Sequence, residues 1–202
     1  MEKTLFNLWL EFEAMQWKDW DPADDFCNIA VDFPDGRRYG INVWTYQYFL
    51  RSIRENETMG ENLDGLYVDP PDLFVKVLSR ECIVAVITDL VSKGDLEEIL
   101  NPSTFNFRYP SGWVTAEDIP DQGREYLDML NGLLKPGHPL YQREFRMEAG
   151  SNEQLVIQLN DKTLALVFTA GNKDEPGFPI TEFFGDKKHF WTARIKRNTK
   201  FN

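Results

Sequence analysis

Four aspartates and a tryptophan between residues 19 and 25 form the densest group of chemically capable side chains: Asp19, Trp20, Asp21, Asp24 and Asp25. Carboxylates this close together suggest calcium. A calcium loop, however, needs oxygen ligands at alternating positions, a central glycine and a closing glutamate. Pro22 and Ala23 occupy the middle of this run, which has neither that glycine nor that glutamate. The sequence therefore predicts no metal site here.

The same carboxylates would suit an acid–base pair of the kind that cleaves glycosidic bonds. That chemistry needs two carboxyl groups that face each other across a cleft and have separated pKa values. A chain with 33 Asp and Glu offers many accidental pairs, so the pattern alone selects none of them. A hydrolase with a carboxylate-based site between two lobes is the alternative hypothesis.

Other catalytic residue types are sparse. The chain has two histidines, His138 and His189, and two cysteines, Cys27 and Cys82. Free cysteine is among the most buried residue types, so neither thiol is expected to act as a nucleophile. Motifs for zinc, dinucleotides, phosphate loops and acyl transfer are absent from the sequence. We therefore predict no catalytic residue and no cofactor.

The net charge of −11 is confined to one half of the chain. Residues 1–100 contain 9 Lys and Arg and 20 Asp and Glu, whereas residues 101–202 contain 13 of each kind. A second acidic run in this half consists of Glu55, Glu57, Glu61 and Asp64. Such a surface repels nucleic acid and anionic membranes, and it attracts basic proteins. The simpler interpretation is that the charge only keeps the protein in solution.

The segment after Asp186 is basic, which raises the alternative of nucleic-acid binding. After Asp186 the chain has six cations and no acid, with aromatic residues between them: Lys187, Lys188, Phe190, Trp191, Arg194, Lys196, Arg197, Lys200 and Phe201. Cations with stacking platforms resemble a small nucleic-acid footprint. Phosphate affinity depends on positive potential, so nucleic-acid binding by an acidic chain is the less favoured interpretation.

The elements that position the acidic residues are predicted from periodicity and turn chemistry. Residues 5–17 alternate like a half-buried strand, and residues 26–33 and 37–44 form a hairpin around Pro34-Asp35-Gly36. Thr45 and Ser79 are expected to cap two helices, and Glu55–Asp64 is expected to be a loop. Further strands are predicted at 66–68 and 73–77.

The second half reads as one helix and an antiparallel sheet. The helix covers Tyr126–Leu134, and the strands cover 141–148, 154–159, 163–170 and 189–196. Residues 101–123 are rich in Pro and Gly, which is typical of a connector. We therefore predict an α+β fold in two lobes, with antiparallel sheets and helices on one face: an acidic lobe at 1–100, a connector at 101–123 and a second lobe at 124–202.

The composition also predicts the cellular compartment of the protein. No stretch is long and apolar enough for a membrane helix, and no secretory signal is visible. Two cysteines cannot make a disulfide framework, so we expect a protein of the reducing cytoplasm with no membrane partner. The oligomeric state is not predicted.

The first half resembles small immunity proteins of bacterial polymorphic toxin systems. The likeness lies in Trp20–Cys27, the hairpin, Asn42-Val43-Trp44-Thr45 entering a helix, and Leu73–Val77 followed by the Ser79 helix. It covers residues 5–95, and its motifs are short. The resemblance implies a non-enzyme that binds one cognate toxin, often a basic nuclease, in the producing cell.

The leading hypothesis is therefore an acidic protein that binds a basic partner, most concretely a toxin. The expected contact residues are Asp19, Trp20, Asp21, Asp24, Asp25, Glu55, Glu57, Glu61 and Asp64. A regulatory adaptor without a toxin is a third possibility.

Overall fold

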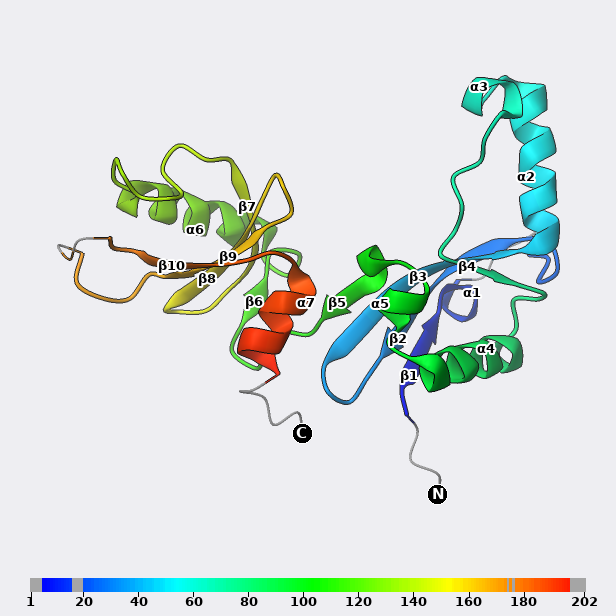
Figure 1. Cartoon of the computed structure of the whole chain (residues 1–202), viewed down its shortest axis with the longest axis horizontal. Coiled ribbons are helices and arrows are strands. Elements are labelled where there is room, and N and C mark those ends of the chain that lie inside the picture. Colours follow the sequence, from blue (N-terminus) through cyan, green and yellow to red (C-terminus); the bar gives the residue numbers. More distant parts are fainter. Residues whose placement is uncertain (1–4, 16–19, 174, 176, 197–202) are drawn as a thin grey trace. The chain divides into compact units, whose positions relative to one another are not determined.

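The computed structural model describes residues 5–15, 20–173, 175 and 177–196. The chain divides into two compact units, residues 1–107 and residues 108–202, and each has its own five-stranded sheet (Figure 1). Together with helices in both units, the sheets confirm the predicted α+β class. In the described part of the chain no helix is long and apolar enough to cross a membrane.

The first sheet is built around a long central strand. Its strands are β1 (Asn7–Leu10), β2 (Phe26–Asp32), β3 (Arg37–Thr45), β4 (Leu73–Val75) and β5 (Phe105–Phe107). β2 pairs along one edge of β3, while β4 and β5 pair with opposite ends of its other edge. β4 runs parallel to β3 and the remaining pairs are antiparallel. The predicted hairpin is confirmed, with Gly36 in the left-handed conformation that its turn requires.

The helices of this unit are α1 (Glu11–Ala14), α2 (Tyr46–Met59), α3 (Asn62–Gly65), α4 (Arg80–Lys93), α5 (Leu96–Ile99) and the 3-10 turn η1 (Pro102–Thr104). Both predicted caps are confirmed: the Thr45 hydroxyl accepts from the Tyr48 amide, and the Ser79 hydroxyl accepts from the Cys82 amide. Ile83 and Ile87 on α4 are fully buried.

Three local predictions for the first half are wrong. Residues 5–17 do not form one strand, because the chain turns into α1 after Leu10 and Glu11 accepts hydrogen bonds from the backbone and side chain of Asn28. Glu55–Asp64 is not a loop, since α2 continues through Glu55 and Glu57 to Met59 and ends at Gly60. The expected strand at residues 66–68 does not form either.

Buried polar contacts fix the end of the sheet where β5 joins β3. The Tyr39 hydroxyl, on a fully buried side chain, donates a 2.6 Å hydrogen bond to the buried Glu97 carboxylate. Burial and this hydrogen bond both raise the pKa of Tyr39. Arg37 bonds Asp35 and Asp95, so ion pairs join the turn of the hairpin to the residue that precedes α5.

The second unit has an antiparallel sheet in the order β10-β9-β8-β7-β6. Its strands are β6 (Val114–Thr115), β7 (Phe145–Gly150), β8 (Gln154–Leu159), β9 (Leu164–Phe168) and β10 (Ile180–Phe184). Helix α6 (Pro120–Leu133) covers one face, where Leu130 packs with Ala165 and Val167. Residues 101–123, predicted as a connector, supply β5 to the first unit and β6 to the second.

The last predicted strand is wrong. Residues 187–195 are helical, as α7 (Lys187–Phe190) and the π-helical turn η2 (Trp191–Ile195), and the edge strand is β10. Asp186 caps α7 by accepting from the His189 amide. Trp191 and Ile195 are buried four residues apart, a helical spacing that the apparent alternation of the sequence concealed.

The state of the two thiols gives a first prediction. Burial, reinforced by the charges of Glu11 and Asp25, raises the pKa of Cys27 to about 12, whereas Cys82 is half-buried. At pH 8 we expect an alkylating reagent to label Cys82 in the native protein and Cys27 only after denaturation, as read by mass spectrometry of peptides. Because the unfolded thiol ionises near pH 8.5 and the folded one does not, stability should also fall above about pH 8.5. Native labelling of Cys27 as fast as Cys82 would contradict this.

Candidate protein-binding surface

The acidic segment before β2 is a folded turn. The structure describes Trp20, Asp21, Asp24 and Asp25 of the predicted contact set, whereas Asp19 lies outside the described residues. Trp20 stacks on Phe12, with ring centroids 5.3 Å apart. The Asp21 carboxylate accepts from the Ala23 amide at 2.9 Å, and that of Asp25 accepts from the Phe26 amide at 2.8 Å. These side chains therefore shape the turn as well as adding charge.

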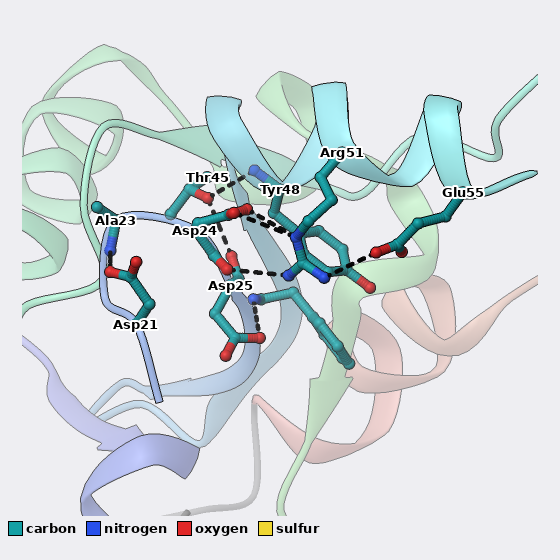
Figure 2. Close-up of polar contacts among 9 residues, drawn as sticks. Asp21, Ala23, Asp24, Asp25, Thr45, Tyr48, Arg51 and Glu55 are labelled. Atoms are coloured by element: carbon teal, nitrogen blue, oxygen red, sulfur yellow. Dashed lines mark hydrogen bonds and ion pairs between the residues drawn. The ribbon is translucent and has the colours of Figure 1, made fainter. Parts of the chain in front are cut away.

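Arg51 joins this turn to helix α2. Its Nε donates to both carboxylate oxygens of Asp24 at 3.1 Å, and Nη2 donates to the Asp24 carbonyl at 3.0 Å. Nη1 reaches Glu55, one helical turn further on, at 3.1 Å (Figure 2). The hydrogen bond to Asp24 raises the pKa of Arg51, and the bond to Glu55 adds to the effect. Asp24 and Glu55 are thus brought together, and one of their two negative charges is compensated.

Helix α2 begins on the sheet and extends away from it (Figure 1). At its base the backbone amide and hydroxyl of Thr45 both donate to the Asp25 carbonyl, at 3.1 and 3.2 Å. Phe49 packs edge-on against Phe74 of β4 at 5.2 Å. Beyond this first part the helix is largely exposed. We call residues 46–69, which comprise α2, α3 and the returning segment, the arm.

The far end of the arm carries the other predicted acids. Glu57, Glu61 and Asp64 are exposed where α2 ends and α3 turns back. Asn62, Leu63 and Asp64 all have φ between 50° and 57°, so α3 is a left-handed turn. The Glu61 amide donates to the Asn56 carbonyl, and the Gly65 amide donates to the Glu61 carbonyl, both at 2.9 Å. These backbone hydrogen bonds therefore close the turn at the tip.

A shallow hollow of about 310 Å³ lies between α2 and the returning segment. Trp44 and Tyr48 form part of its wall in an edge-to-face pair with centroids 4.9 Å apart. The carboxylate residues at the hollow are Glu55, Glu61 and Asp69. Burial raises the pKa of Tyr48, an effect that the charge of Arg51 partly opposes. The arrangement suits a cationic side chain, which both acids and aromatic faces attract.

The sequence did not point to the apolar part of this surface. Four large apolar side chains are exposed at the tip: Met59, Leu63, Leu66 and Tyr67. Leu66 and Tyr67 fall in the predicted strand at 66–68, which does not form, and both are exposed directly after the left-handed turn. The irregular composition around Gly60 and Gly65 was the one available signal, because glycine favours positive φ.

Three other chemically capable residues, His138, Glu13 and Asp161, have hydrogen-bond partners within the protein. The His138 ring accepts from the Leu140 amide and contacts the Pro179 carbonyl, so it ties two loops of the second unit together. The pKa of Glu13 is lowered by its hydrogen bond to Arg80, and that of Asp161 by backbone bonds, which is opposite to what a general acid requires. The described residues include no cluster of potential ligands able to hold a metal ion.

Comparison with known proteins gives no relative. No protein-family model, no curated protein and no solved structure matches this chain.

The ion pair at the base of the arm generates a second prediction. Arg51→Gln should lower the free energy of unfolding by roughly 0.5–1 kcal/mol, because it removes an exposed contact in which Nε and Nη2 bond the carboxylate and the carbonyl of Asp24. The loss should shrink at high salt, which screens the wild-type interaction. Arg54→Gln, on the same helix, is the matched control and should change stability less. Urea denaturation, which adds no ions, measures both, and equal effects of the two changes would contradict the assigned role.

The tip generates a third prediction. In Gly65→Ala the new Cβ would lie 2.5 Å from Glu57 Cγ and 3.2 Å from the Glu57 amide nitrogen, at a backbone φ of 78°. We expect the turn to open, so that amide hydrogen exchange at residues 61–66 accelerates about tenfold or more. Gly132→Ala, inside α6 with nothing within 4 Å, is the control and should leave the tip unchanged. Unchanged exchange at the tip in Gly65→Ala would show that the close approach is relieved without opening.

Proposed function

We propose that this chain is a non-enzymatic protein that binds a basic partner protein through its acidic first unit, most concretely an immunity protein that neutralises a cognate toxin in the cytoplasm of the producing cell. The observation that carries the proposal is the exposed acidic arm. It projects from a unit that holds the whole net charge of the chain, because residues 101–107 contain no charged side chain.

Charge placement supports a basic partner. Glu57, Glu61 and Asp64 are exposed at the tip, and Glu55, Glu61 and Asp69 lie at the hollow. Acidic groups on a projecting element meet an approaching protein early, where they accelerate association with a positively charged surface. Aromatic and apolar groups beside them supply the contact area that charges alone do not.

The toxin assignment rests on the resemblance of residues 5–95 to immunity proteins. In such a complex the binding protein covers the active site or the assembly surface of the toxin, and it needs no catalytic group of its own. Asp24 and Asp25 also build the base of the arm, so a test of recognition should leave them intact.

The fourth prediction concerns charge reversal at the tip. Glu57→Lys, Glu61→Lys and Asp64→Lys together should weaken capture of a basic protein from a lysate of the source cell by tenfold or more at low salt. The loss should be much smaller at high salt, since screening already removes the electrostatic contribution there. The readout is quantitative mass spectrometry of captured proteins along a salt series.

A matched control reverses three exposed acids of the second unit: Glu117→Lys, Glu125→Lys and Asp128→Lys. It changes the net charge equally, so it separates placement from total charge. Equal losses in both triple variants would refute recognition by the arm.

A growth assay tests whether the captured protein is a toxin. Production of the captured protein alone should arrest growth, and co-production with this chain should restore growth. A captured protein that does not slow growth would favour the adaptor.

A further inference from the structure

The tip of the arm carries an apolar surface that its fold leaves exposed. Met59, Leu63, Leu66 and Tyr67, here called the tip patch, are 71%, 70%, 80% and 50% exposed. Single exposed apolar residues are normal on protein surfaces. Here four large ones fall between residues 59 and 67 on a projecting element, and this concentration requires an explanation.

The tip patch is held in a costly conformation. Leu63 is a γ-branched residue at φ 56°, and its neighbours Asn62 and Asp64 are also left-handed. The left-handed region is unfavourable for a side chain such as that of Leu63, whereas Asn and Asp tolerate it better. Gly60 and Gly65 flank the turn, and Gly65 lies so close to Glu57 that a side chain does not fit. A preformed patch loses little conformational entropy on binding, which is the advantage that offsets this cost.

The charges around the tip patch select its occupant. Glu57, Glu61 and Asp64 are exposed, and they alternate along the sequence with its apolar members. A second copy of this chain would bring the same negative charges against them, and anionic lipid would do the same. A protein surface with an apolar groove edged by lysine or arginine complements both features.

We propose that the tip patch is the anchor of the interface, inserted into an apolar groove that basic side chains border on a partner protein. The inference rests on the proposed function and adds the part of the surface that supplies lasting contact. Acidic residues then govern the rate of association, while Leu63, Leu66 and Tyr67 govern how long the complex persists.

The fifth prediction uses a defined probe. A labelled amphipathic helical peptide of leucine and lysine presents an apolar stripe with cationic edges, and fluorescence anisotropy measures its binding to the full chain. Leu63→Ser, Leu66→Ser and Tyr67→Ser together should weaken binding about tenfold or more at both low and high salt. The same peptide with glutamate in place of lysine should not bind.

The matched control replaces three exposed apolar residues elsewhere: Val84→Ser, Met129→Ser and Ile180→Ser. It should alter peptide affinity by less than about twofold, since Val84 lies on α4 and the other two side chains belong to the second unit, so none of them is part of the arm. Thermal unfolding of both triple variants checks that each variant remains folded. Unchanged peptide affinity in the tip variant, or an equal loss in the control, overturns the proposal.

Binding of the tip patch to a second copy of the chain, or to lipid, would also contradict the proposal. Dimerisation of the wild-type chain that the tip variant abolishes would assign the patch to a second copy. Binding to neutral phosphatidylcholine vesicles that the tip variant abolishes would assign it to lipid.

The charge-reversal and serine variants together distinguish failure of the anchor from failure of the proposed function. If charge reversal at the tip abolishes capture of the basic protein while the serine variant leaves the peptide bound, the function stands and the anchor fails. If the serine variant releases the peptide while charge reversal leaves capture intact, the anchor stands and the proposed function fails.

Discussion

The contact between Arg51 and Asp24 joins the arm to the acidic turn before β2. α2 leaves the sheet after β3 with few buried side chains, Ser52 being its one buried position among the described residues. An amphipathic helix normally gains its stability from a packed face. Here that role falls to a short base, where Phe49 meets Phe74, Thr45 caps the helix, and Arg51 binds the turn before β2. The acidic turn is thereby part of the support of the arm.

This arrangement divides the acidic residues into two kinds. Asp21, Asp24 and Asp25 accept hydrogen bonds from backbone amides or from Arg51, so these carboxylates help to form the base of the arm. Glu57, Glu61 and Asp64 stand at the exposed tip beside large apolar side chains. In the sequence these acidic residues look alike. The structure separates the acids that support the base of the arm from those that are exposed at its tip. Electrostatic attraction and apolar contact then occupy the same short segment.

Much of the fold follows from local chemistry, and the errors have physical causes. The hairpin and the caps at Thr45 and Ser79 were predictable, because turn and cap residues act over three or four positions. The end of α2 was missed, because Glu55 and Glu57 are good helix formers in a polar run that reads as a loop. The helix at 187–195 was not predicted, because Trp191, Ala193 and Ile195 alternate with other residues as they would in a strand. Arg51 binding Asp24, 27 residues away, is a tertiary contact that periodicity does not encode.

The central claim is that the arm is the recognition surface. Amide hydrogen exchange of the full chain, alone and with the basic protein it captures, measures this residue by residue. The account predicts slower exchange on binding in residues 55–67, with residues 108–196 unchanged. Protection confined to the second unit, with the arm exchanging as fast as in the free protein, would contradict it.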